Sequence, residues 1–427
     1  MTSKPSSVAI VGGGIMGLAT AFYLRRLGVA ATVYERGEPG NEQSTRALGY
    51  VRCQGRHKAE IALAVAANKM WPGLSGELQA DLEYVREGNL VVAETEADEA
   101  RLLRSAEAAR AHGLSTRAVD RAEIAGISPR LAGPWRSGIF TAEDGHAAPA
   151  KATDAFAQAA RRNGAAIKTC LGVRRIAMED GRAVGVVTDA GSERADAVLA
   201  VAGISTNFLL KPLGWNLPIQ TVRSSNAETV PQAPFTRTGV WTPYVSMRPR
   251  WDGSFAFGTG YRGTRLDHDV GAGTLAHLKH FLPLYIRNPR RPRMRFNRDF
   301  ADNLRRRASA RANAQPMAEP VVNAALAGER LVWAERFFPH LKPLALARAW
   351  SGRIDVTPDM IPIIGALGAP KGVYVAAGFC AHGLAISPVV GKSLAELIVT
   401  GRSEADLRPF RPERFREGDF ADDPTAL

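Results

Sequence analysis

The N-terminal region alternates short apolar runs with a helical repeat. Residues 7–11 (SVAIV) form an apolar run typical of a buried strand, and residues 15–27 carry apolar side chains at helical spacing. Residues 29–35 (VAATVYE) predict a second strand. Glycines separate the first strand from the helix, so the pattern predicts a strand–helix–strand unit of the kind that builds parallel sheets.

The rest of the chain passes from helical repeats to short strands and returns to the opening pattern at its end. Residues 150–164 predict an amphipathic helix, and residues 215–262 alternate as the strands of an antiparallel sheet do. Further strands are predicted at 167–176, 183–188, 197–202 and 373–377, and further helices at 274–286, at 299–312 and from about Pro388 to Thr400.

This order predicts an α/β protein in which two domains are interleaved. A chain of 427 residues is long enough for two cores. We expect a Rossmann-like nucleotide-binding domain assembled from residues 1–80, 145–215 and 345–427. We expect an antiparallel β-rich substrate domain assembled from residues 81–144 and 216–344, including a basic helical insertion at about 265–340.

Composition narrows the class of protein. Three scattered cysteines, Cys53, Cys170 and Cys380, indicate neither a disulfide framework nor a zinc site, and no metal site is expected. Residues 1–7 are short and polar, and no run reaches the roughly 18 apolar residues of a membrane span. We therefore expect a cytoplasmic protein, with peripheral contact on the inner face of the membrane left open.

The net charge of +13 is concentrated in one segment. Between Arg287 and Arg311 there are ten arginines and two acids. No aromatic residues are interleaved with Lys or Arg elsewhere, so nucleic-acid binding is not expected. The segment has three interpretations: a solvated basic face, a patch that contacts anionic lipid, or a surface that recruits an acidic substrate or partner.

The glycine turn after the first strand has the spacing of a dinucleotide-binding motif. Gly12 permits a tight turn, Gly14 lets the backbone approach a pyrophosphate, and Gly17 lets helix and strand pack closely. The helix N-terminus attracts phosphate. Glu35 ends the second strand, 21 residues after Gly14, where an acid can accept hydrogen bonds from ribose hydroxyls. This motif alone leaves FAD and NAD open.

Two further stretches resemble a known family. Residues 44–56 read STRALGYVRCQGR, and the C-terminal part contains WSG at 350–352, DVTPD at 355–359, PIIG at 362–365, AGFCAHGL at 377–384 and SPVVG at 387–391. Together with GGGIMG at 12–17, these motifs resemble the FAD-dependent D-amino acid oxidase superfamily, which includes glycine oxidase, sarcosine oxidase and bacterial amino acid dehydrogenases. The 44–56 block, Gly145-His146-Ala147 and the basic insertion most resemble bacterial membrane-associated L-amino acid deaminases.

The resemblance implies an FAD-binding domain of the glutathione-reductase-2-like fold, with the adenosine at Gly12–Gly17 and the C-terminal turn at the flavin ring. Ser387 and Pro388 are expected to begin a helix whose dipole stabilises the reduced flavin. His382 is either a turn histidine bonded to backbone or a flavin-facing residue. The residues expected to contact FAD are Gly12, Gly14, Ile15, Met16, Gly17, Glu35, Arg36, Ser44, Thr45, Arg46, Gly49, Val173, Ala202, Gly203, Gly352, Asp359, Gly378, Phe379, His382, Gly383 and Leu384.

The chain departs from relatives in three respects. Relatives with covalent flavin carry a cysteine close to the Trp-x-Gly segment, whereas here Ser351 and Arg353 flank Gly352, so we expect non-covalent FAD. Sarcosine oxidases carry a substrate-binding lysine after the Gly-His-Gly turn, where this chain has Ala385. They also carry an oxygen-activating lysine before a glycine in the β-domain, and residues 255–258 (FAFG) have none.

Oxidation of an amino acid needs a neutral amine, a Cα–H aimed at the flavin and a fixed carboxylate. An arginine is the natural carboxylate clamp. Candidate arginines are Arg52, Arg248, Arg250, Arg262, Arg295 and Arg348. We expect the catalytic site to comprise Arg52, Gln54, Arg262 and His382, with Trp241 and Tyr244 either wall residues or core aromatics.

The resulting function is hydride transfer from the CH–NH2 bond of a small amino acid or amine to FAD, which gives an imine and then a 2-oxo acid. Oxygen or a separate acceptor would then take the electrons. One alternative is a secondary amine such as an N-alkyl amino acid or a proline-like ring. An alternative of another class is a non-catalytic flavoprotein subunit, and an NAD-only dehydrogenase is less favoured because it gives the C-terminal glycine turn no purpose.

Overall fold

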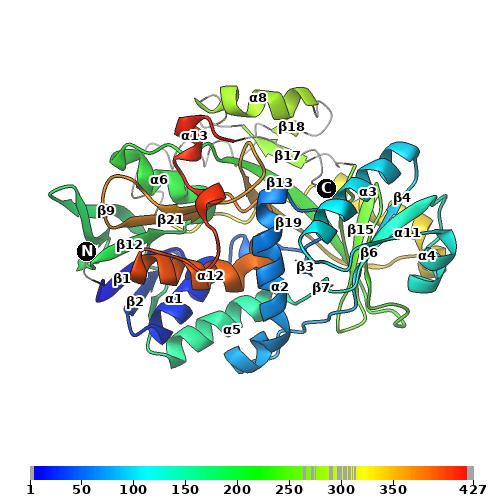
Figure 1. The fold of residues 1–427 in the computed structure, drawn as a ribbon, viewed down its shortest axis with the longest axis horizontal. Coiled ribbons are helices and arrows are strands. Elements are labelled where there is room, and N and C mark those ends of the chain that lie inside the picture. The colour runs from blue at the N-terminus through cyan, green and yellow to red at the C-terminus, as the bar shows by residue number, and fades with distance from the viewer. Residues whose placement is uncertain are drawn as a thin grey trace.

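The computed structural model describes residues 4–262, 266–270, 274, 276–287, 292–295, 301, 305, 309, 311 and 314–420. Two sheets organise these residues, and they lie on opposite sides of the molecule in Figure 1. A six-stranded sheet carries the N-terminal strand, and a ten-stranded sheet is built mainly from the middle of the chain. The arrangement confirms the α/β class predicted from the sequence.

The six-stranded sheet brings together segments that are far apart in the sequence. Its strand order is β20 (Ile363–Ala366), β21 (Val373–Ala377), β12 (Ala197–Ala200), β1 (Ser7–Val11), β2 (Ala30–Tyr34) and β8 (Ala166–Lys168). The β1 strand pairs in parallel with β2 and β12, whereas β20 pairs antiparallel with β21.

Both faces of this sheet are covered, which explains why β1 is a continuous apolar run. Val8 and Ile10 pack in the core formed with four helices, and Ala9 and Val11 pack in the core on the opposite face. The four helices are α1 (Ile15–Arg26), α2 (Lys58–Leu78), α5 (Pro149–Arg162) and α12 (Gly383–Thr400). The opposite face is covered by the small sheet of β9 (Val173–Glu179), β10 (Arg182–Thr188) and β11 (Gly191–Arg194).

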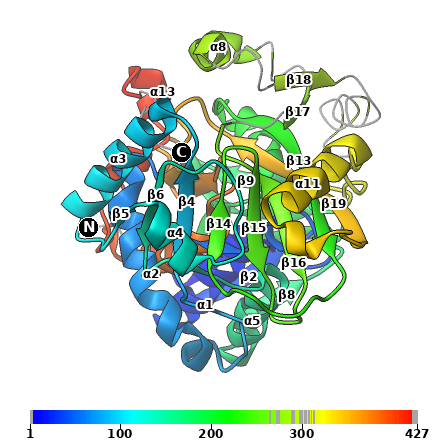
Figure 2. The same ribbon diagram turned by 90° about the vertical axis from the view of Figure 1, so that its right-hand side faces the viewer.

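The ten-stranded sheet forms the other side of the molecule (Figure 2). Its path is β18 (Pro292–Arg295), β17 (Leu266–Asp269), β13 (Gln220–Thr229), β16 (Phe255–Thr259), β15 (Val245–Pro249), β14 (Gly239–Trp241), β4 (Asn89–Ala93), β6 (Ser137–Thr141) and β5 (Arg117–Val119), with β19 (Leu346–Val356) paired to β13. The β19 strand thus joins this sheet although it begins in the segment expected to belong to the nucleotide-binding domain. Among the described residues, the remaining α-helices are α3 (Glu96–Ala111), α4 (Arg121–Ile127), α6 (Thr206–Leu210), α8 (Leu278–Arg287), α11 (Ala324–Phe337) and α13 (Arg414–Glu417), and a short two-stranded sheet pairs β3 (Tyr50–Val51) with β7 (Gly145–His146).

The start of α12 corrects the expectation that Ser387 and Pro388 begin the last long helix. The helix begins at Gly383, and Pro388 lies inside it. Proline has no N–H to give to the carbonyl four residues earlier. That carbonyl belongs to Leu384, and it accepts the Ser387 hydroxyl at 2.9 Å instead. A serine next to the proline therefore compensates for the missing backbone bond.

Among the described helices, α12 is the one long and apolar enough to cross a membrane, but 67% of that stretch is buried within the protein. It packs against α1 and α2, as the core helix of a globular domain does.

The basic insertion is only partly described. The α8 helix agrees with the helix predicted at 274–286, and β18 adds a strand where none was expected. The helix predicted at 299–312 lies almost entirely outside the described residues. In Figures 1 and 2, α8 and β18 lie at the edge of the molecule opposite α5.

Candidate active site

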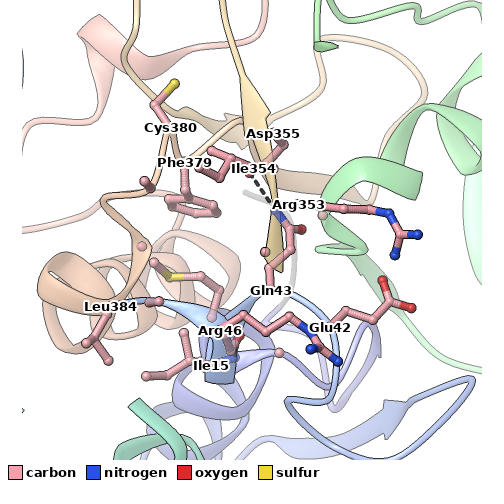
Figure 3. A pocket seen from close by; sticks show the side chains of 18 of the residues that line it. Ile15, Glu42, Gln43, Arg46, Arg353, Ile354, Asp355, Phe379, Cys380 and Leu384 are labelled. Carbon is pink, nitrogen blue, oxygen red and sulfur yellow. Dashed lines mark hydrogen bonds between the residues drawn. The ribbon is translucent and has the colours of Figure 1, made fainter. Parts of the chain in front are cut away.

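An extended cavity of about 410 Å³ lies between the two sheets. One part is lined by the glycine turn after β1, the end of β2 and Val173; another is lined by β13, β19 and the turn before α12. Figure 3 shows part of this cavity, with Gln43 reaching toward Asp355. The same cavity reaches Trp241 of the large sheet and Tyr261, which follows the strand β16.

The glycine turn has no space for side chains. Gly12 has φ +123°, and a Cβ there would stand 2.3 Å from the carbonyl oxygen of Val201. A Cβ at Gly17 would stand 2.1 Å from the carbonyl oxygen of Gly12. The α1 helix begins with Gly14 at its N-cap, which makes no side-chain capping bond. Gly14, Ile15 and Met16 line the cavity, so the start of the helix lies there in the manner of phosphate-binding helices.

Glu35 is held at the cavity wall by two backbone donors. Its carboxylate accepts from the N–H of Gly13 at 2.7 Å and from the N–H of Gly37 at 2.9 Å. Burial raises the pKa of Glu35, and these two hydrogen bonds oppose that effect. A carboxylate oxygen has capacity for further donors, so Glu35 fits the hydroxyls of a ribose.

The segment between β2 and β3 covers the cavity next to this turn. The N–H of Ile15 donates to the Ser44 hydroxyl at 2.9 Å, which fixes this segment on the start of α1. Arg36 pairs with Glu42 and donates to the Ser205 hydroxyl at 3.0 Å. The indole N–H of Trp350 donates to the carbonyl of Arg46 at 3.0 Å.

A buried carboxylate that was not among the predicted site residues organises the turn before α12. Asp355 accepts from the N–H of Gly378 at 2.7 Å and from the Gln43 amide at 3.0 Å. Both Gln43 and Asp355 line the cavity, and Figure 3 shows the bond between them. The Gln43–Asp355 pair therefore joins the segment before β3 to the strand β19 across the cavity wall.

Two buried arginines face the part of the cavity beside the large sheet. The Arg52 guanidinium lies 4.3 Å from the ring centre of Trp241 and donates to the Gln54 carbonyl at 2.7 Å. Arg56 donates through Nε to the Arg52 carbonyl at 3.2 Å, and its Nη1 is buried without a hydrogen-bond partner among the described residues. Burial and the charge of Arg56 lower the pKa of Arg52 to about 9. An anion at this point would satisfy both side chains.

The segment that carries these arginines is fixed by a second acid that the sequence analysis missed. Asp144, fully buried, accepts from the N–H of Cys53 at 2.6 Å and from that of Gln54 at 3.3 Å. Burial raises the pKa of Asp144 to about 7, against the effect of these donors and of Arg52.

His382 is bonded to a side chain and not to backbone through its ring. Its Nδ1 lies 2.8 Å from a carboxylate oxygen of Glu60, which belongs to the first turn of α2 and is completely buried. His382 lines the cavity. Neither Glu60 nor Arg56 stood among the predicted site residues. Their signal in the sequence was the QGR-H-K-A-E run, whose polar residues continue into an otherwise apolar helix.

Most of the predicted cofactor residues line the cavity. These are Gly12, Gly14, Ile15, Met16, Glu35, Arg36, Ser44, Arg46, Gly49, Val173, Ala202, Gly203, Gly352, Phe379, His382, Gly383 and Leu384. Gly17, Thr45 and Gly378 are not part of the lining, although each is next in the chain to a residue that is. Of the predicted catalytic residues, Arg52 and His382 line the cavity.

Three predicted site residues have structural partners elsewhere. Arg262 was wrongly placed at the substrate: it donates to Asp98 and Glu94, each at 2.9 Å, outside the cavity. Gln54 is completely buried and bonds Thr141 and Asn89. Asp359 forms a buried ion pair with Arg414 at 2.8 Å. None of these three residues is part of the cavity lining.

The other candidate arginines also have protein partners. Arg248 donates to the carbonyl of Ala147 at 3.0 Å, and Arg250 and Arg348 pair with Glu228 at 3.3 and 3.0 Å. The structure does not describe the side chain of Arg295. Trp241 lines the cavity, whereas Tyr244 stacks on Trp333 at 4.0 Å in a core cluster.

A glycine-rich turn at a helix N-terminus, an acid at the end of the second strand and a long cavity between two sheets are typical of a dinucleotide-dependent enzyme. The sequence model described as FAD dependent oxidoreductase, the DAO family, matches residues 7–397. The chain belongs to this family and is an FAD-dependent oxidoreductase, as its motifs predicted.

Individual proteins are similar over nearly the whole chain. The uncharacterized oxidoreductase YurR of Bacillus subtilis (strain 168) is 27% identical, over 95% of this chain and 98% of that protein. Glycine oxidase of Geobacillus kaustophilus (strain HTA426) is 23% identical, over 94% and 95%. The structure of L-amino acid deaminase from Proteus vulgaris matches with a TM-score of 0.87 at 22% identity, over 96% and 97%. This last likeness confirms the predicted fold.

Proposed function

We propose that this enzyme oxidises the CH–NH2 bond of an amino acid, with the carboxylate held by Arg52 and Arg56 and the Cα hydrogen directed at FAD. The observation that carries the proposal is the pair of buried arginines in the cavity. A buried guanidinium without an acidic partner is costly, and a substrate carboxylate removes that cost for Arg56. The oxidases and deaminases among its relatives support the same chemistry.

FAD fits the long cavity on the chemistry of the residues present. The glycine turn and the start of α1 would hold the pyrophosphate, Glu35 would hold the adenosine ribose, and residues 379–384 would border the flavin ring. When bound, FAD supplies the acceptor for the hydride. The α12 helix begins at this turn, and its N-terminal dipole favours negative charge there.

The attachment of FAD is non-covalent in this proposal. Cys380 is the cysteine at the cavity, and its thiol donates to the carbonyl of Gly378 at 3.2 Å and contacts the Thr357 hydroxyl. In Figure 3 its sulfur points away from the ring of Phe379. Burial raises the pKa of the Cys380 thiol far above its usual value, which suppresses the thiolate that a covalent bond requires.

The protein's own contribution to the reaction is positioning and exclusion of water. Arg52 is fixed by the Trp241 ring and the Gln54 carbonyl, so a carboxylate bound to it has a defined place. Trp241 and Tyr261 close the cavity beside the large sheet, and the Tyr261 hydroxyl is engaged with the carbonyl of Val92 at 2.8 Å. The wall beside the arginines therefore offers apolar surface to the rest of the substrate.

An anaerobic titration tests the function. The purified enzyme is mixed with pools of L-amino acids, D-amino acids and N-methyl amino acids, and absorbance is followed near about 450 nm, where oxidised flavin absorbs and reduced flavin does not. We expect one of the two primary amino acid pools to bleach the flavin. Bleaching by the N-methyl pool alone would indicate a secondary-amine enzyme, and a flavin that no pool bleaches would contradict the proposal.

We also propose that the basic insertion contacts anionic membrane on the cytoplasmic side. On α8, Leu278, Leu282 and Ile286 stand four residues apart and are 42%, 47% and 69% exposed, and Met294 of β18 is 47% exposed. An exposed apolar stripe that leads into an arginine-rich segment resembles the pattern of an interfacial helix. Sedimentation with anionic and with zwitterionic liposomes tests this: Leu282→Glu should reduce binding to anionic liposomes, and Val332→Glu on α11 should not. Equal binding of all three proteins would contradict it.

A further inference from the structure

Beside Arg52 and Arg56, the cavity is also lined by His382. Arg52 and Arg56 offer only N–H groups, whereas His382 offers a ring nitrogen. The Glu60 carboxylate lies 2.8 and 3.1 Å from His382 Nδ1, so this nitrogen carries the proton and Nε2 of the neutral ring is an acceptor. No described residue bonds Nε2, and the His382 side chain keeps 16% of its surface exposed in the cavity.

We propose that the His382–Glu60 pair accepts the proton of the substrate's ammonium group, and that binding of the substrate carboxylate at Arg52 and Arg56 switches this acceptor on. The inference rests on the proposed function for the identity of the substrate. In the step, one N–H bond of the ammonium breaks, its electron pair stays on the amine nitrogen, and the proton forms a new N–H bond at His382 Nε2. The neutral amine can then form the C=N bond as the Cα hydride leaves to FAD.

The charges around His382 explain why substrate is needed. Burial and the positive charges of Arg56 and Arg52 lower the pKa of His382 to about 4, while Glu60 acts in the opposite direction. The charged and titratable groups that act on the pair are Arg52 and Arg56 from the segment after β3 and His57 at the start of α2. The arginines are the charges that a bound carboxylate neutralises.

Carboxylate binding and protonation of the pair are therefore linked. A carboxylate on Arg52 and Arg56 removes the repulsion that depresses the proton affinity of His382, and its own charge attracts the proton. By thermodynamic reciprocity, protonation of the pair must tighten carboxylate binding to the same degree. A zwitterionic amino acid brings its own proton to Nε2, whereas a carboxylic acid anion without an amine must take the proton from solvent.

Glu60 is a positioning residue in this account, because it touches His382 and not the substrate. It is completely buried on α2, and it orients the ring and supplies the counter-charge for the imidazolium. Glu60→Gln keeps the shape and removes the charge. Glu60→Asp keeps the charge at a longer distance, so it should restore part of the lost effect.

The test uses propionate, a carboxylate that cannot be oxidised as an amine, bound to the FAD-loaded enzyme. Its Kd is measured from the perturbation of the flavin spectrum between pH 6 and 8, and proton uptake is measured by calorimetry in two buffers. We expect the wild-type Kd to tighten by about fivefold or more toward pH 6, as linked protonation requires. We expect this pH dependence to disappear in His382→Gln and Glu60→Gln and to return partly in Glu60→Asp. His112→Gln, on the surface at the end of α3, is the matched control.

A wild-type Kd that is independent of pH, or a His382→Gln variant that keeps the full pH dependence, would overturn the inference. The pH dependence of the wild-type Kd tests the inference even if the Glu60 variants do not fold. Failure of the proposed function is a separate result: no amino acid would bleach the flavin, whereas propionate binding would still report on the His382–Glu60 pair.

Discussion

The Asp355 carboxylate accepts the backbone N–H of Gly378 at 2.7 Å, and the backbone carbonyl of Asp355 accepts the N–H of Cys380 at 2.9 Å. One residue of the large sheet thereby holds the turn that leads from the six-stranded sheet into α12. The turn needs this support, because Cys380 and Ala381 both have positive φ values, of 49° and 68°, which cost energy for residues with a Cβ.

Loss of the Asp355 carboxylate should loosen this turn. Asp355→Ala leaves the Gly378 N–H and the Gln43 amide without their acceptor, so we expect a loss of about 1–3 kcal/mol in the free energy of unfolding. FAD occupancy should fall as well. Thermal unfolding and the ratio of flavin to protein absorbance measure the two effects, with the exposed Asp154→Ala as control. Full FAD occupancy and unchanged stability would show that the turn is held by other contacts.

Glu35 gives a prediction for the adenosine end of the cavity. Glu35→Gln keeps the shape but loses one of two acceptor positions for backbone N–H groups and its charge, so we expect FAD to bind about tenfold more weakly, the size of one charged hydrogen bond. The measurement is the Kd of FAD for the apoprotein from fluorescence quenching. The control is Glu38→Gln, a change at an exposed neighbouring residue, which should leave the Kd unchanged. An equal Kd in both variants would show that Glu35 does not bind the ribose.

The arginines give a prediction for the substrate end. Arg52→Met and Arg56→Met should each raise the half-saturating substrate concentration by about tenfold or more, since a charged hydrogen bond contributes about 1.5–3 kcal/mol. FAD binding should change far less. Arg348→Met, which loses an ion pair outside this part of the cavity, is the control. If Arg348→Met raised the half-saturating concentration as much as the other two, the carboxylate would not be at Arg52 and Arg56.

Buried histidines make stability depend on pH. Burial and the charge of Arg248 lower the pKa of His146 to about 3, and burial lowers that of His268 to about 4. Below the unfolded-state histidine pKa of about 6.5, these two histidines bind protons in the unfolded chain but stay neutral in the folded protein. The stability is therefore complete above about pH 6.5 and is lost as the pH falls toward the folded values, by up to about 1.4 kcal/mol per pH unit for each histidine.

The variant His146→Gln isolates one of these contributions. Its amide can still donate to the carbonyl of Arg237, which lies 3.0 Å from His146 Nε2, and it does not titrate. Its unfolding free energy should fall less steeply than that of the wild type between about pH 6.5 and 5, as linkage requires. Parallel pH curves from urea unfolding would mean that His146 takes up a proton in the folded protein as easily as in the unfolded chain.

The local motifs could be predicted from the sequence because their geometry depends on few residues. The Gly12 turn follows from its spacing and from Glu35, and the cavity forms around both. The ion pairs of Arg262 could not be predicted, because its partners Asp98 and Glu94 lie more than 160 residues earlier in the chain. Residues such as Glu60 and Asp355 gain their roles only when distant segments meet.

The start of α12 shows a further limit of local rules. Ser387 and Pro388 satisfy the preferences of a helix start, yet the Ser387 hydroxyl bonds the Leu384 carbonyl inside the helix. Gly391 of α12 packs closely against Ala19 of α1, since a Cβ added at Gly391 would stand 2.6 Å from the Cβ of Ala19. This packing positions α12 against α1, and it cannot be predicted from capping preferences.

The most direct test of the central claim, an amino acid held by two arginines and oxidised by the flavin, is anaerobic flavin reduction by one substrate pair. Wild-type enzyme and the Arg52→Met/Arg56→Met double variant are each mixed with the amino acid that bleaches the flavin fastest and with the corresponding amine that lacks the carboxylate. We predict rapid bleaching of the wild type by the amino acid alone, and loss of that preference in the double variant. Equal bleaching of both proteins by both compounds would contradict the claim.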